Sequence, residues 1–190
     1  LAQYEFPEEL LGATRYGSGH INETYCIVCQ PKEGDAVRYI LQGLSQAAFP
    51  HPEELMDNFV NITSFLQKNI REEGGDCNRE ALKIIRTKDR KNYYTDSNGK
   101  VWRLVPFIED TDCYQSATPE LFEESARAFG RFQYLLRDYP AALLHETIKN
   151  FHNTEDRFKK FMDALKADKC GRAAEVADEV NFVLSREADC

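Results

Sequence analysis

Residues 17–25 read Gly-Ser-Gly-His-Ile-Asn-Glu-Thr-Tyr and lie between an apolar run and a β-prone run. This pattern predicts a tight turn between two strands. Glycine has no Cβ, so the backbone at Gly17 and Gly19 can fold closely and direct its N–H groups toward an anion. Two glycines alone more often mark a plain turn than a ligand site, so the rest of the chain has to decide between the two interpretations.

Strands are expected on both sides of this glycine loop, which we define as residues 17–22. Residues 10–16 form the predicted first strand, and residues 24–30, rich in β-branched and aromatic side chains, form the second. A turn and a third strand over residues 36–44 follow. Short connections of this kind predict an antiparallel meander.

A helix is expected to begin at Pro52, since proline suits the first helical turn. Its predicted core face holds Leu55, Phe59, Ile62 and Leu66. Further strands are predicted over residues 81–87, 93–95 and 101–108, with Asn98-Gly99 as the turn of a hairpin. Residues 1–109 are therefore predicted to form an antiparallel sheet of five or six strands with one helix inserted.

The remainder of the chain has a helical pattern. Thr118 is predicted to cap a helix that begins at Pro119. One face of this helix holds Phe122, Ala126, Phe129, Gln133 and Leu136, with Phe132 beside it. Two more helices are expected over residues 155–168 and 173–186. The predicted fold class is α+β, with one part over residues 1–109 and a second over residues 110–190.

Composition limits the classes of partner. The chain has 190 residues, 42% of them hydrophobic and 29% charged, which suits one sizeable core. A net charge of −8 disfavours nucleic acid or an anionic membrane as the main partner. A phosphate ligand remains compatible with that charge because local dipoles can attract it. No stretch approaches the roughly 20 apolar residues of a membrane span.

The six cysteines do not form a metal or redox motif. Cys26 and Cys29 have the spacing of one half of a zinc site, but they lie in a predicted strand, where they would point to opposite faces. Structural or surface thiols are the favoured interpretation. Scattered cysteines suit a reducing compartment, so a cytoplasmic location is expected.

Several stretches, taken in order, resemble one known family. Besides the glycine loop they are residues 39–42 (Tyr-Ile-Leu-Gln), 103–109 (Arg-Leu-Val-Pro-Phe-Ile-Glu), 128–133 (Ala-Phe-Gly-Arg-Phe-Gln), 146–154 (Glu-Thr-Ile-Lys-Asn-Phe-His-Asn-Thr) and 167–172 (Ala-Asp-Lys-Cys-Gly-Arg). They resemble the phosphotransferase family of aminoglycoside and choline kinases, and within it the branch that phosphorylates N-acetylhexosamines.

The resemblance implies a fold and a reaction. Residues 1–109 would be a protein-kinase-like N-terminal lobe, and residues 110–190 the helical start of a C-terminal lobe. The activity would be transfer of the γ-phosphoryl group of ATP, with Mg²⁺, to the anomeric hydroxyl of an N-acetylhexosamine in carbohydrate metabolism. Two alternatives stay open: a kinase for choline, homoserine or an aminoglycoside, and a non-catalytic nucleotide-binding module.

The resemblance also implies site residues. Those expected to contact the nucleotide are Gly17, Ser18, Gly19, Asn22, Ile40, Gln42, Pro106, Phe107 and Ile108. Ile40 would press on adenine, and the segment of residues 106–109, which we call the hinge, would bind adenine through its backbone. His20 is expected on the side of the sugar acceptor. His152 and Asn153 would either border the sugar or cap a helix, and capping is favoured.

Two departures from the family pattern limit these expectations. Gln42 stands where protein kinases carry a phosphate-binding Lys, and a neutral amide supplies no charge. No stretch fits the His-x-Asp-x-x-x-x-Asn catalytic loop or the later Asp that holds Mg²⁺. The chain is therefore expected to be the N-terminal part of a kinase, with no catalytic residue, no metal ligand and no activity of its own.

Overall fold

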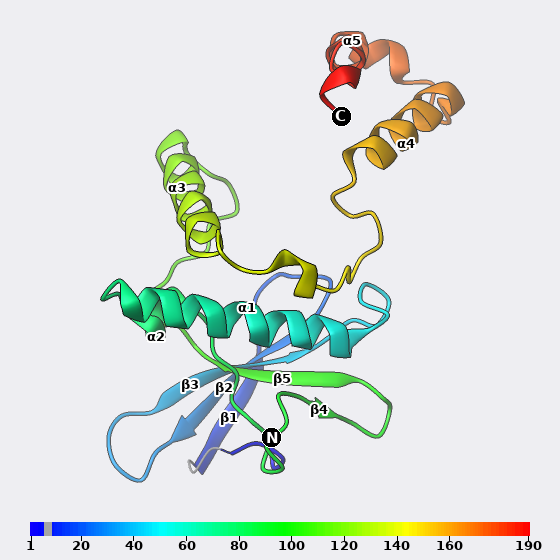
Figure 1. Ribbon diagram of the computed structural model, residues 1–190. Coiled ribbons are helices and arrows are strands. Elements are labelled where there is room, and N and C mark those ends of the chain that lie inside the picture. The colour runs from blue at the N-terminus through cyan, green and yellow to red at the C-terminus, as the bar shows by residue number, and fades with distance from the viewer. Residues whose placement is uncertain (6–8) are drawn as a thin grey trace. The chain divides into compact units, whose positions relative to one another are not determined.

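The computed structural model of the chain describes residues 1–5 and 9–190. Two compact units divide the chain, Leu1–Thr147 and Ile148–Cys190. All the strands that are described belong to the first unit, and the second contains helices (Figure 1). The chain is α+β, as predicted. The predicted boundary at 109/110 falls inside the first unit, which also includes the helix that follows it.

The first unit is built on a five-stranded antiparallel sheet with the order β1-β2-β3-β5-β4. Its strands are β1 Glu9–Arg15, β2 Glu23–Gln30, β3 Val37–Gly43, β4 Tyr94–Thr95 and β5 Val101–Pro106. The predicted meander and the predicted hairpin are both confirmed. Gly99 at the hairpin turn has φ +79°, a conformation that glycine adopts without strain.

The predicted strand over residues 81–87 is wrong. Instead of pairing along their length, these residues make two isolated bridges, Ile85 to Leu104 and Thr87 to Tyr4. β3 pairs along one edge of β5, and β4 pairs with Val101 and Trp102 on the other. Beyond β4, the described residues make a single bridge to that edge, at Leu104.

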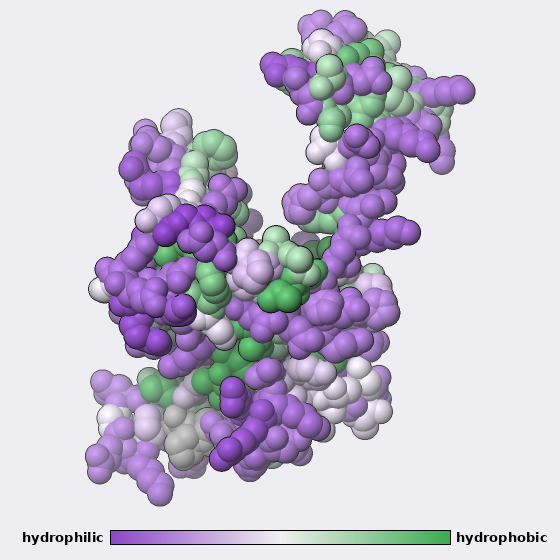
Figure 2. All heavy atoms as spheres, in the orientation of Figure 1, coloured by the Kyte–Doolittle hydropathy of each residue, from purple (hydrophilic) through white to green (hydrophobic). Residues whose placement is uncertain are grey.

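Helix α1, Pro52–Glu72, lies across one face of the sheet (Figure 1). Its Met56 packs with Leu44 and Val101 of the sheet side, and all three are almost fully buried. Figure 2 shows hydrophobic residues gathered where this helix meets the sheet. The predicted core face is confirmed, because Leu66 is buried and its predicted partners Leu55, Phe59 and Ile62 are partly buried.

A short helix, α2 Cys77–Glu80, follows α1 and was not predicted. Asp76 caps it by accepting a hydrogen bond of 2.9 Å from the Asn78 N–H. An Asp just before a four-residue helix is a weak sequence signal because the same residue also favours plain turns.

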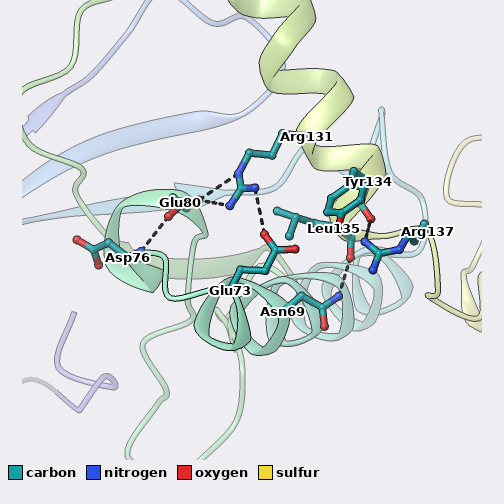
Figure 3. Close-up of polar contacts among 8 residues, drawn as sticks. All are labelled: Asn69, Glu73, Asp76, Glu80, Arg131, Tyr134, Leu135 and Arg137. Atoms are coloured by element: carbon teal, nitrogen blue, oxygen red, sulfur yellow. Dashed lines mark hydrogen bonds and ion pairs between the residues drawn. The ribbon is translucent and has the colours of Figure 1, made fainter.

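Helix α3, Pro119–Leu135, begins as predicted, with the Thr118 hydroxyl accepting from the Leu121 N–H at 3.3 Å. Near its other end, Arg131 forms ion pairs of 3.2 Å with Glu73 and 2.9 Å with Glu80 (Figure 3). The Asn69 amide also donates to the Leu135 carbonyl oxygen at 2.7 Å. These contacts attach the C-terminal end of α3 to α1 and α2.

The apolar face predicted for α3 is largely exposed to solvent. The Phe122 and Phe129 side chains are 71% and 67% exposed. A 3₁₀ turn, Ala141–Leu143, follows α3. Helical periodicity thus located the helix but did not show which part of its apolar face would be covered.

The second unit begins with α4, Thr154–Ala167, capped by Asn153, whose Oδ1 accepts from the Asp156 N–H at 2.8 Å. The capping interpretation of Asn153 is confirmed. The single helix predicted over residues 173–186 is wrong. It is divided into a 3₁₀ turn Ala173–Val176, helix α5 Ala177–Leu184 and a second 3₁₀ turn Glu187–Asp189.

The break falls at Val176, which leaves helical angles with φ −122° and ψ 35°. A β-branched side chain loses rotamer freedom in a helix, which makes this departure less costly here. None of the helices within residues 1–5 and 9–190 combines the length and the apolar character that crossing a bilayer requires.

Candidate functional site

A cavity of about 310 Å³ lies within the first unit against β3, β5 and the segment after β5. Five of the predicted nucleotide-binding residues line it: Ile40, Gln42, Pro106, Phe107 and Ile108. The other lining residues are Tyr16, Phe59, Leu82, Arg103, Val105 and Thr111. The structure therefore brings together residues from β3 and the hinge that are about sixty positions apart in the sequence.

Strand pairing explains the arrangement of the lining. Ile40 of β3 lies opposite Val105 of β5, and Gln42 lies opposite Arg103. Residues two apart on a strand share a face, so both pairs face the cavity, separated by about 7 Å along the strands. The predicted shared face of Ile40 and Gln42 is confirmed. The cavity is apolar beside the hinge and polar near Gln42 and Arg103, toward the start of β5.

The hinge is held against β3 by one residue. The Phe107 N–H donates a hydrogen bond of 3.0 Å to the Arg38 carbonyl oxygen. The Arg38 guanidinium lies 4.0 Å from the centre of the Phe107 ring and donates from Nε to Glu109 at 2.9 Å. Tyr16 meets the same ring edge-on, with 5.4 Å between ring centres. The position of the hinge is thus set by the start of β3.

Neighbouring backbone groups of the hinge remain available for a ligand. Within the described part of the chain, the Phe107 carbonyl oxygen and the Ile108 N–H have no hydrogen-bond partner. The Ile108 carbonyl oxygen accepts from the Thr111 hydroxyl at 3.1 Å. These two groups belong to one trans peptide unit and point in opposite directions, so the Ile108 N–H can donate to a base only when the Phe107 carbonyl oxygen is directed away from it.

The polar end of the cavity is a row of side chains across three strands. The Gln42 Oε1 atom accepts two hydrogen bonds from Arg103, 3.1 Å from Nε and 2.7 Å from Nη2. The Gln42 Nε2 atom donates to the Thr24 hydroxyl at 3.1 Å. The Arg103 guanidinium also lies over the Phe59 ring of α1, 4.3 Å from its centre.

Arg103 is a site residue that sequence reasoning missed. Burial lowers the pKa of its guanidinium to about 10, so it stays charged at neutral pH. No carboxylate among the described residues forms an ion pair with it. The available signal was a charged residue inside a strand whose neighbours Leu104 and Val105 are apolar.

The glycine loop connects β1 and β2, and the Tyr16 N–H closes its base by donating to the Thr24 carbonyl oxygen at 2.9 Å. Gly17 has φ +78°, which confirms that this position needs glycine. A Cβ added at Gly17 or Gly19 would meet no atom within 4 Å. Both glycines and Ser18 are exposed and are not among the residues that line the 310 Å³ cavity.

Asn22 and His20 lie elsewhere. Both line a separate, open cavity of about 520 Å³ together with Lys100. The Asn22 Oδ1 atom accepts a hydrogen bond of 2.9 Å from the Ser45 N–H, which ties the loop to the segment after β3. His20 is exposed. The structure does not bring these two predicted residues together with those of the 310 Å³ cavity.

The Cys26 and Cys29 side chains are both buried in β2. In residues 1–5 and 9–190 there is no group of three or more His, Cys, Asp or Glu side chains placed to hold a metal ion. Comparison of the chain with models of known protein families gave no match.

Proposed function

We propose that the chain is the nucleotide-binding part of an ATP-dependent kinase that phosphorylates the anomeric hydroxyl of an N-acetylhexosamine. One observation carries the proposal: a single cavity collects Ile40, Gln42, Pro106, Phe107 and Ile108. The resemblance of the sequence to a phosphotransferase family independently predicts these five residues as nucleotide contacts.

The lining suits adenine at the hinge end. Ile40, Leu82 and Val105 offer an apolar surface to a flat base, and the hinge offers the Ile108 N–H, which has no hydrogen-bond partner among the described residues. A volume of about 310 Å³ is at the lower end of ligand pockets, which suits a base and its ribose. The phosphates would then extend toward Gln42 and the glycine loop.

ATP with Mg²⁺ would supply the phosphoryl group that is transferred. Residues of this chain would bind and orient the nucleotide, and His20 is proposed as a contact on the acceptor side. Neither a catalytic base nor a Mg²⁺ ligand is assigned to residues 1–190. The proposed ligands are ATP and a small sugar.

Calorimetric titration with ATP and adenosine tests nucleotide binding. We expect Ile40→Glu to abolish binding of both ligands because it places a carboxylate against the base. Leu11→Glu is the matched control, since Leu11 is 56% exposed on β1. Absence of ATP binding to the parent chain, or equal binding by the Ile40→Glu variant, would refute the assignment of the cavity.

An acceptor panel tests the reaction on the longer kinase of which residues 1–190 would be the nucleotide-binding part, because these residues alone are expected to be inactive. We expect phosphate transfer to N-acetylglucosamine or N-acetylgalactosamine, with phosphorus NMR showing a sugar 1-phosphate. Transfer to choline, homoserine or an aminoglycoside would show that the acceptor is wrongly assigned, while the assignment as a kinase would stand. Nucleotide binding without transfer to any acceptor would instead support the non-catalytic module.

A further inference from the structure

The 310 Å³ cavity contains a cation without a counter-ion. Among the described residues that line it, Arg103 is the single charged side chain. Arg103 is partly buried, and a charge withdrawn from water is unfavourable unless it is paired. A guanidinium does not avoid this cost by losing its proton at neutral pH. A ligand that brings negative charge to this position would therefore be stabilised.

The guanidinium is held in a defined orientation. Gln42 receives two of its N–H groups on one oxygen, and Thr24 in turn anchors the Gln42 amide. The Phe59 ring supports the guanidinium plane. An arginine has five N–H donors in a rigid fork, and in the described residues Nη1 has no hydrogen-bond partner. Donors thus remain for a ligand, and little conformational entropy is lost on binding.

The other cations near this end of the sheet are engaged elsewhere. Arg38 pairs with Glu109, and Lys100 pairs with Glu23 at 2.9 Å. Arg15 lies 5.9 Å from the centre of the Tyr25 ring and lines the 520 Å³ cavity, not the 310 Å³ cavity. Arg103 is therefore the cation whose charge is available to a molecule in the 310 Å³ cavity.

We propose that Arg103 binds the phosphate groups of the nucleotide and so supplies the positive charge that Gln42 lacks. Gln42 is then a positioning residue, whose oxygen orients the guanidinium. This inference rests on the proposed function, because the phosphate is taken to belong to a nucleotide whose base lies beside Ile40. ATP and a free polyphosphate present the same kind of phosphate groups to Arg103, so the test has to distinguish these two ligands.

The test compares three ligands, adenosine, ATP and inorganic tripolyphosphate, by calorimetry on the whole chain. For the parent chain we expect ATP to bind at least about tenfold more tightly than adenosine. Arg103→Met should remove about tenfold or more of the ATP affinity and abolish tripolyphosphate binding, while adenosine affinity stays within about twofold. Arg103→Lys should recover part of the ATP affinity because it keeps a charge.

Arg71→Met is the matched control, because Arg71 is exposed near the end of α1 and lines none of the cavities described above. It should leave all three affinities unchanged. Thermal melting of each variant shows whether it folds, and Arg103→Lys replaces Arg103→Met if the latter does not.

The outcomes separate this inference from the proposed function. If Arg103→Met binds ATP as the parent does, or loses adenosine and ATP equally, Arg103 is not the phosphate contact although the nucleotide site stands. If tripolyphosphate binds through Arg103 but adenosine and ATP do not compete with it, the anion site stands and the nucleotide function fails. If no ligand binds, both are overturned.

Discussion

The Phe107 N–H donates a hydrogen bond of 3.0 Å to the Arg38 carbonyl oxygen, and the Arg38 guanidinium lies 4.0 Å from the centre of the Phe107 ring. Backbone and side chain of one β3 residue thus hold the same hinge residue. Because the adjacent Ile108 offers the free N–H, the direction of that group depends on Arg38.

Replacing Arg38 with Ala should therefore weaken nucleotide binding without unfolding the protein. The backbone hydrogen bond remains, but the stacking contact and the Glu109 pair are lost. We expect ATP affinity to fall about two- to fivefold, measured by calorimetry, with only a small change in melting temperature because the pair is exposed. Arg71→Ala is the control. Unchanged ATP affinity would show that Arg38 does not orient the hinge.

Truncating a buried side chain in the hydrophobic core between α1 and α3 should strongly destabilise the fold. Ile70 is completely buried and packs with Leu66, Ala81 and Leu135. Ile70→Ala should lower the free energy of unfolding by about 2–5 kcal/mol in urea denaturation. Phe129→Ala, at a side chain that is 67% exposed, should change it by less than about 0.5 kcal/mol. Equal effects of the two variants would contradict the packing of α3.

The ion pairs of Arg131 should make stability depend on pH. The hydrogen bond from Arg131, followed by that from the Asp76 N–H, lowers the pKa of the Glu80 carboxyl below its ordinary value. A carboxyl whose folded pKa is lowered adds stability above its unfolded pKa and loses it as pH falls through the folded pKa.

Arg131→Met should accordingly lower the melting temperature at pH 7, and the difference from the parent should shrink as pH falls below about 4.5. Arg127→Met is the matched control, because Arg127 pairs with Glu123 within α3 at 2.9 Å and joins no second helix. A pH-independent difference for Arg131→Met would show that the pair with Glu80 does not stabilise the fold.

Trp102, the single tryptophan, reports on the β4–β5 turn. Its Nε1 donates to Asp96 Oδ2 at 2.9 Å, and this bond is the main cause that lowers the pKa of the Asp96 carboxyl. Asp96→Ala should shift the Trp102 emission to longer wavelength and reduce stability at neutral pH. In the parent the same shift should appear only as pH falls below the ordinary Asp pKa of about 3.9. Ser97→Ala, at the exposed neighbour, should leave the emission unchanged.

Local sequence signals predicted much of the fold. Pro52, Thr118 and Asn153 mark helix starts through properties of their own side chains, and Asn98-Gly99 marks a hairpin through its backbone preference. The wrong predictions concern features that depend on contacts between residues far apart in the sequence. Residues 81–87 have strand character, but whether they pair along their length depends on which edges of β5 are already occupied, and no local pattern reveals that.

The candidate site also combines features that a local pattern predicts with features that depend on distant contacts. Strand alternation placed Ile40 and Gln42 on one face, and the structure agrees. The role of Arg103 was missed because it depends on the register that sets it opposite Gln42. The separate position of Asn22 depends on its contact with Ser45, twenty-three residues away, and a loop sequence does not determine such a contact.

Hydrogen exchange of the Ile108 amide, with and without saturating ATP, tests the central claim most directly. If adenine binds at the hinge, exchange at Ile108 should slow, together with exchange in β3 around Ile40. The same experiment with tripolyphosphate should leave Ile108 unchanged. ATP binding that protects other segments while Ile108 exchanges at its free rate would contradict the account of this cavity.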